Sequence, residues 1–136
     1  PGLNDSSKEI DAMSKWVVDN LGEDVPHHFT AFHPDFRMRD LPPTSPSTLD
    51  RARTIAMENG ERYVYTGNVR DTAGQSTYCH HCGAVLIERN WYRLGEWGLD
   101  DEGRCASCGT GCPGVLESRP GSWGARRRPV RLVDWP

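Results

Sequence analysis

The sequence predicts an α/β protein in two unequal parts, an incomplete parallel sheet followed by a small cysteine-containing β module. Helical and strand-like patterns alternate through the first half of the chain, from residue 6 to residue 66. Two C-x-x-C-G motifs follow within residues 77–110. Alternating helices and strands predict parallel strands joined by crossover helices, and paired C-x-x-C motifs predict a metal-binding module.

The first helix is expected to begin after Ser6, because Ser6 and Glu9 form a capping-box pattern. Gly22 is expected to end it. Between these signals the residues that recur at helical spacing are Ile10, Met13, Trp16, Val17 and Leu21. The segment from Val25 to Phe32 is too short for a helix and predicts a strand, with apolar residues compatible with burial on both faces.

A proline-containing loop from Pro34 to Pro46 follows, and a loop of this length often closes over a functional site. Ser45 as N-cap and Pro46 at the first helical position predict a second helix that ends at Gly60. Its apolar face would contain Leu49, Ala52, Ile55 and Ala56. Arg62 to Thr66 predicts a second strand. Two parallel strands are not stable alone, so the sheet needs more strands than this chain supplies.

The composition shifts divide the chain into four parts. They are residues 1–68, part of a larger β/α unit; residues 69–76, a glycine-containing linker; residues 77–116, a four-cysteine ribbon; and residues 117–136, a basic C-terminal tail. Within the ribbon, Ala84 to Arg89 and Trp91 to Leu94 are the expected strands of a hairpin. Trp123, Val130, Leu132 and Trp135 would attach the tail to the rest of the molecule.

The candidate metal ligands are Cys79, Cys82, Cys105 and Cys108. A glycine follows each pair and tolerates the left-handed conformation that closes a metal-binding knuckle. The 22 residues between the pairs slightly exceed the usual range of about 15 to 20, and a β-hairpin would fill them. A closed set of four thiolates leaves no position for water or substrate, which predicts a structural site. Zinc is the default metal, and the likeness of the paired knuckles to rubredoxin leaves iron open.

Two disulfides, or buried cysteines without a metal, are the alternatives to this site. Five cysteines would leave Cys112 unpaired, and no signal segment opens the sequence, so we expect reduced cysteines in a soluble, cytoplasmic protein. Cys112 is then expected to be a free thiol near the cage. His80 and His81 lie inside the first knuckle and are alternative ligands.

Charge and composition limit the function classes. The net charge of −3 argues against general nucleic-acid binding, and no apolar run is long enough to span a membrane. The hydrophobic fraction of 36 % is low, which indicates help from a metal or a covering partner. Arg126, Arg127 and Arg128 would form a solvated face, with binding of a phosphate or an acidic partner as the alternative. The adjacent His27 and His28 point to opposite faces of a strand and are interpreted as structural.

Five segments, taken in order along the whole chain, carry a family resemblance. They are Pro1-Gly2-Leu3-Asn4-Asp5, His28 to Pro34 (HFTAFHP), Arg62 to Val69 (RYVYTGNV), Thr77-Tyr78-Cys79 and Gly121-Ser122-Trp123-Gly124. The chain resembles the radical SAM enzymes of the AmmeMemoRadiSam system, which are relatives of the activating enzymes of glycyl-radical proteins. The resemblance implies the last part of a TIM-like, partial β/α barrel, followed by a small zinc-ribbon or rubredoxin-like β module.

The resemblance also implies where S-adenosylmethionine would bind. His33 would follow the end of a barrel strand and contact this cofactor, with capping of the turn before Pro34 as the alternative. Pro1, Gly2 and Asn4 would form a loop near the adenine, although Asn4 also suits a simple helix cap. The family's partners by association, besides the rest of the barrel itself, are Memo-like and AMMECR-like proteins.

The sequence departs from the family in one respect. Radical SAM enzymes hold a four-iron four-sulfur (4Fe-4S) cluster on a C-x3-C-x2-C motif, and no three of the five cysteines follow one another in that order and spacing. We therefore interpret the chain as the C-terminal portion of an enzyme that cleaves S-adenosylmethionine reductively to a 5′-deoxyadenosyl radical, and we do not expect this stretch alone to be active. The alternative is a free-standing zinc-ribbon adaptor that binds protein or nucleic acid.

Overall fold

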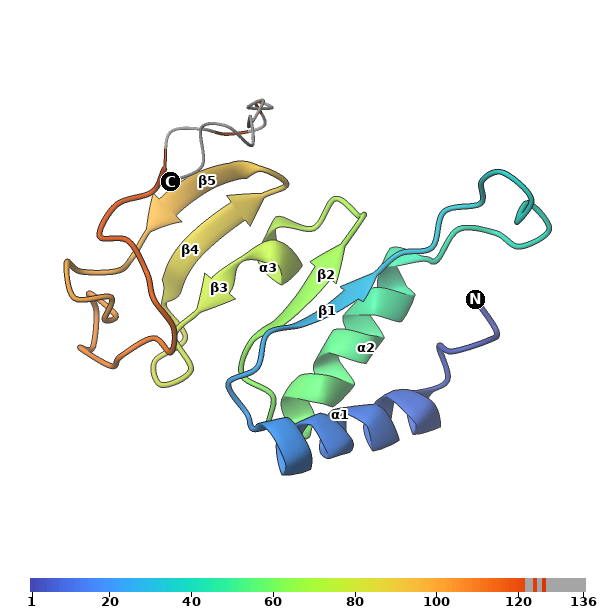
Figure 1. Cartoon of the computed structure of the whole chain (residues 1–136), viewed down its shortest axis with the longest axis horizontal. Helices are drawn as coiled ribbons and strands as arrows, with labels where there is room; N and C mark the ends of the chain where they lie inside the picture. Colours follow the sequence, from blue (N-terminus) through green and yellow to red (C-terminus); the bar gives the residue numbers. More distant parts are fainter. Residues whose placement is uncertain (122–123, 125, 127–136) are drawn as a thin grey trace, which may run out of the picture.

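The computed structural model describes residues 1–121, 124 and 126, and Figure 1 shows two halves side by side. The N-terminal half, residues 1–68, combines two long helices with a two-stranded sheet. The ribbon, residues 77–116, contains a three-stranded sheet. The fold is therefore mixed α/β, as predicted, and the strands of the described residues form no closed barrel.

Both long helices begin where the sequence predicted. Helix α1 spans Ser7–Leu21, and the side chain of its N-cap Ser6 accepts a hydrogen bond from the backbone N–H of Glu9. Helix α2 spans Pro46–Glu58 and is capped in the same way by Ser45. These caps satisfy backbone donors that have no partner within the helix, which is why local sequence is enough to place them.

The predicted apolar face of α1 is buried only in part. Ile10 and Ser14 are buried, and Ser14 Oγ lies 2.7 Å from the Nδ2 of Asn59, which follows α2. Small residues on the facing side of α2, Ala52 and Ala56, are 2 % and 0 % exposed. The helices thus contact through small side chains, while three large residues of α1 remain largely exposed: Met13, Trp16 and Leu21.

The sheet of the N-terminal half is parallel, as predicted from the alternation of elements. Strand β1, His27–Thr30, pairs in parallel with β2, Val64–Gly67, and α2 connects the two. Both strands are shorter than predicted, and burial of β1 on both faces was wrong, because His28 and Thr30 are exposed. The reason is that α2 packs against both strands (Figure 1), whereas β1 makes no comparable contact with any helix or strand other than α2 and β2 in the part of the chain that the structure describes.

The ribbon contains β3, Thr77–Tyr78, β4, Val85–Asn90, and β5, Arg93–Trp97, in one antiparallel sheet. The predicted hairpin is confirmed, but its second strand lies further along the chain than expected, because Trp91 and Tyr92 form the tip and β5 continues to Trp97. A small core forms beneath the hairpin from Cys79, Leu86, Ile87, Leu99 and Cys105. Two of the candidate metal ligands are thus part of the core itself.

Residues 69–76, which we expected to be a linker, contain the four-residue helix α3, Thr72–Gln75. The side chain of Asp71 caps α3 through the backbone N–H of Gly74 and accepts a hydrogen bond from Thr66 Oγ1 at 2.8 Å. Gln75 donates from Nε2 to the carbonyl of Val69 at 2.7 Å. Because α3 packs against both β2 and β4, this segment joins the two halves by contacts on both sides.

The loop from Pro34 to Pro46 is closed at its base by hydrogen bonds between Phe32 and Thr44. Its outer part exposes Phe36 and extends away from the ribbon (Figure 1).

Of the predicted tail, Arg126 is described and exposed. The other predicted tail residues lie outside the described residues: Trp123, Arg127, Arg128, Val130, Leu132 and Trp135. No helix among the described residues has the length and apolar character needed to cross a membrane.

His27 and His28 point to opposite faces of β1, as predicted. His28 stacks on Tyr65 of β2, with ring centroids 4.9 Å apart. His27 Nδ1 lies 2.8 Å from the Oε2 of Glu61, whose side chain is fully buried. Burial raises the pKa of Glu61 above its ordinary value, and the hydrogen bond with His27 opposes that rise.

A raised pKa means that folded Glu61 binds its proton more tightly than unfolded Glu61. Its carboxyl therefore stabilises the fold below the ordinary pKa of about 4.3, and this contribution is lost as pH rises through the raised value. In Glu61→Gln this titration is absent. We expect the unfolding free energy of the wild type, relative to this variant, to fall as pH rises above about 4.3 and through the raised pKa of Glu61.

Urea unfolding of both proteins across a pH series measures this difference. Loss of metal at low pH affects both proteins alike and cancels in the comparison. A difference that stays constant with pH would contradict the assignment.

Candidate metal centre

The two C-x-x-C-G motifs form matching knuckles. The backbone N–H of Gly83 donates to the carbonyl of Cys79 at 2.9 Å, and that of Gly109 donates to the carbonyl of Cys105 at 2.7 Å. Both glycines have a φ of +74°, the left-handed conformation that we predicted for them. A side chain at either position would strain the turn that brings two sulfurs together.

A second hydrogen bond fixes the start of each knuckle. The backbone N–H of Cys79 donates to the carbonyl of Ala84, and that of Cys105 donates to the carbonyl of Thr110, both at 2.8 Å. Each knuckle presents one buried and one exposed thiol, with Cys79 and Cys105 as the buried members. The two halves of the centre are therefore held by the same backbone pattern.

All four sulfur atoms lie within 4.8 Å of one another. Two pairs across the knuckles are closer, with 3.6 Å between the Sγ atoms of Cys79 and Cys108 and 3.7 Å between those of Cys82 and Cys105. A tetrahedron with metal–sulfur bonds of about 2.3 Å has sulfur–sulfur edges of about 3.8 Å. A disulfide would need about 2.05 Å. The predicted four-cysteine group can therefore hold a metal ion, and its cysteines are not paired as disulfides.

The pKa values of the two exposed thiols, Cys108 and Cys82, are shifted in opposite directions. The hydroxyl and backbone N–H of Thr110 lower the pKa of Cys108 to about 6. The backbone N–H of Ala84 lowers the pKa of Cys82, but the neighbouring thiols outweigh it and raise that pKa to about 12. Four thiolates this close repel one another, so protons compete with a cation for the site and metal affinity falls at low pH.

The two histidines of the first knuckle are not part of the sulfur group. His80 Nδ1 lies 3.1 Å from the hydroxyl of Tyr63, and His81 is exposed. Cys112 is a free, partly buried thiol whose Sγ lies 3.9 Å from the same Tyr63 hydroxyl, and burial raises its pKa. Tyr63 thus connects the N-terminal half to the first knuckle and to Cys112, which lies beyond the second knuckle. Sequence reasoning missed this role, because nothing near Tyr63 in the sequence signals a distant partner.

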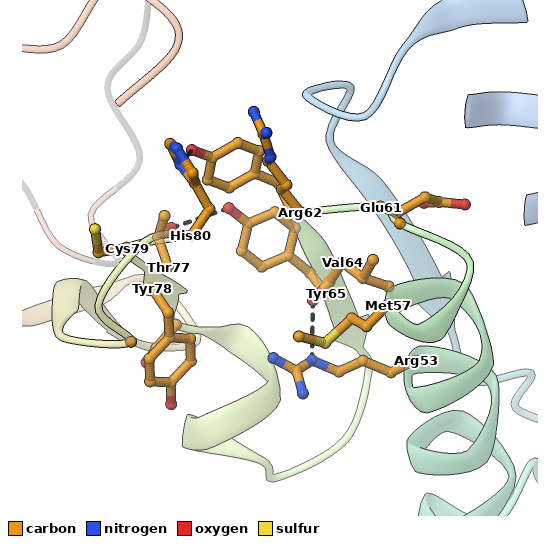
Figure 2. Close-up of a pocket in the computed structure, with 14 residues that line it drawn as sticks. Arg53, Met57, Glu61, Arg62, Val64, Tyr65, Thr77, Tyr78, Cys79 and His80 are labelled. Carbon is orange, nitrogen blue, oxygen red and sulfur yellow. Dashed lines mark hydrogen bonds between the residues drawn. The ribbon is translucent and has the colours of Figure 1, made fainter. Parts of the chain in front are cut away.

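A cavity of about 470 Å³ lies between α2, β2 and the first knuckle. Figure 2 shows Cys79 and His80 on one side of it and Arg53 and Met57 of α2 on the other. Arg53 Nε donates to the carbonyl of Val64 at 3.0 Å, which anchors the helix to the strand. The cavity marks the junction at which the metal centre meets the N-terminal half.

The predicted cofactor residues do not all come together. Pro1 and Asn4 line a second cavity, of about 410 Å³, between the N-terminal segment, α1 and β1. The backbone N–H of Gly2 donates to Asp5 Oδ1 at 2.8 Å. His33 is exposed beyond the end of β1 and is not among the residues lining that cavity.

A comparison with curated proteins finds an archaeal relative. An uncharacterized protein of Methanocaldococcus jannaschii is 44 % identical over 110 residues, which is 80 % of this chain and 33 % of that protein. The chain therefore spans about a third of the length of the curated relative that it matches. No protein-family model matches the chain, and no solved structure matches it.

The sulfur geometry predicts about one tightly bound metal ion per chain and no acid-labile sulfide. Replacing Cys79 or Cys108 by serine should abolish stoichiometric binding and unfold the ribbon, because metal binding and folding are coupled in such small modules. Helices α1 and α2 should be affected less. Elemental analysis and limited proteolysis measure the two effects.

Cys112→Ser is the matched control, since Cys112 lies beside the centre but outside the sulfur group. It should retain its metal and its digestion pattern. If Cys79→Ser and Cys112→Ser behaved alike, the assignment of the four ligands would be wrong.

Proposed function

We propose that this chain is the C-terminal portion of a radical SAM enzyme of the AmmeMemoRadiSam type, in which the ribbon serves as a structural metal module. The observation that carries the proposal is the parallel pairing of β1 and β2 across α2. This strand–helix–strand unit is the repeating element of β/α barrels. Its occurrence beside a four-sulfur cage is the combination that the family resemblance implies.

The two-stranded sheet of β1 and β2 has the properties of a fragment of a larger parallel sheet. Parallel sheets are ordinarily covered on both faces and contain more than two strands. Here His28 and Thr30 of β1 are exposed, and Met13 and Trp16 of α1 are exposed by 39 % and 56 %. The matched relative is about three times as long as the region that matches it. Further elements of a TIM-like barrel would cover part of this exposed surface.

In this proposal the chain contributes cofactor contacts, and the 4Fe-4S cluster is bound elsewhere in the parent enzyme. His33 follows β1, and the carboxyl ends of barrel strands are where function lies. Pro1, Gly2 and Asn4 would meet the adenine side of S-adenosylmethionine. The chain has no C-x3-C-x2-C motif, so its residues do not fit the cluster and no step of the radical chemistry is assigned to them.

The metal of the ribbon is proposed to be zinc, with iron as the alternative, because four thiolates complete a tetrahedral site. With no open position, the ion would hold the knuckles together and take no part in catalysis. The proposed partners are the rest of the barrel and, by family association, Memo-like and AMMECR-like proteins. The proposed compartment is the cytoplasm.

The test compares the full-length M. jannaschii relative with this chain. Each is reconstituted anaerobically with iron and sulfide and incubated with S-adenosylmethionine and a strong reductant, and 5′-deoxyadenosine is measured. We expect turnover by the relative and none above a no-protein control by the chain, because only a longer protein can supply the cluster ligands.

Turnover by this chain alone would show that its five cysteines hold a redox cluster. A relative that lacks the C-x3-C-x2-C motif and forms no product would refute the proposal and favour the zinc-ribbon adaptor.

A further inference from the structure

The tip of the β4–β5 hairpin lies beside the carboxyl end of β2 (Figure 1), and a cavity of about 530 Å³ opens between them. The sheet side of this cavity, which we call the tip cavity, is formed by His28 and Tyr65. The hairpin side is formed by Arg89, Trp91 and Tyr92. It is separate from the sulfur group and shares none of its cysteines.

Aromatic rings line both sides of the tip cavity. His28 stacks on Tyr65 with an interplanar angle of 27°, and Tyr65 is fixed through its hydroxyl, 3.0 Å from Thr77 Oγ1. Trp91 and Tyr92 are 45 % and 69 % exposed. Large exposed aromatic side chains that border a cavity offer flat surfaces on which a planar ligand can stack.

The backbone around the tip cavity is strained and held in place. Among the described residues, three that are not glycine have a positive φ, and two of them, Asn68 at +57° and Trp91 at +55°, line this cavity. Such a conformation is unusual for a bulky tryptophan. The backbone N–H of Trp91 donates at 2.8 Å to Oε1 of Gln75, which is 7 % exposed. Strain maintained by a buried partner is a common property of binding sites.

The charge of the tip cavity is positive. Arg89 is a cation among the lining residues, and none of them is a carboxylate. Within residues 1–121 the Arg89 guanidinium makes no ion pair. Partial desolvation and the nearby Arg89 charge lower the pKa of His28 below its ordinary value, so this imidazole is protonated less readily than usual.

We propose that the tip cavity binds a small planar carboxylate, with Arg89 pairing its anionic group and the aromatic side chains stacking on its ring. A guanidinium matches a carboxylate in plane through two parallel hydrogen bonds. A phosphate site usually combines several cations or the N-terminus of a helix, whereas Arg89 is the one Lys or Arg among the residues that line this cavity. The inference stands on these residues alone and does not depend on the proposed enzyme.

The experiment titrates the zinc-loaded chain with benzoate and follows the indole N–H signal of Trp91 by NMR, assigned with Trp91→Phe. We expect a saturable shift with benzoate. Uncharged benzamide, which has the same shape, should bind at least about tenfold more weakly, and inorganic phosphate should bind no better than benzamide.

Arg89→Gln should weaken benzoate binding by at least about tenfold, and Arg89→Lys should give an intermediate loss because it keeps the charge without the planar fork. Arg93→Gln is the matched control, since Arg93 lies on β5 of the same hairpin, is exposed and does not line the tip cavity. Unchanged amide signals elsewhere show that each variant is folded.

The proposal is overturned if benzoate causes no saturable shift, or if benzamide or phosphate binds as tightly as benzoate. It is also overturned if Arg89→Gln and Arg93→Gln have equal effects in folded protein.

Discussion

The convergence of four thiols is the constraint on which the ribbon depends. Cys79 and Cys105 belong to its small apolar core, so the residues that can bind a metal are also the residues that pack. A core of this size offers little hydrophobic stabilisation, and a metal ion held by the four cysteines would add to it. Tyr63 links the N-terminal half to the ribbon, because its hydroxyl contacts His80 of the first knuckle and Cys112 beyond the second knuckle. The position of the N-terminal half therefore also depends on the four thiols.

Features specified by neighbouring residues could be predicted from the sequence. The helix caps at Ser6 and Ser45 and the left-handed Gly83 and Gly109 follow from local backbone chemistry, and the structure has them where they were expected. Parallel pairing of the two strands followed from the order of the elements. The four candidate ligands were likewise defined by spacing alone.

Features that depend on distant partners were not predictable in this way. The spacing of apolar residues identified α1 but not which of them would be buried, because Ser14 meets Asn59 across 45 positions of sequence. The role of Gln75 was hidden for the same reason, since its partner Trp91 is 16 positions away. A polar glutamine in a glycine-containing stretch suggests a loop. Only the folded structure shows that the amide nitrogen and the amide oxygen of Gln75 both form hydrogen bonds.

The short helix α3 limits where insertions can be tolerated during the evolution of such a chain. The Gln75 amide nitrogen donates to the carbonyl of Val69, and its oxygen accepts a hydrogen bond from the backbone N–H of Trp91. The number of residues between β2 and β3 therefore determines where the hairpin tip lies. An insertion there would move the tip relative to the sheet. The loop between Phe32 and Thr44, closed at its base by its own hydrogen bonds, could lengthen without moving anything else. Length variation among natural variants would then be confined to one side of the molecule.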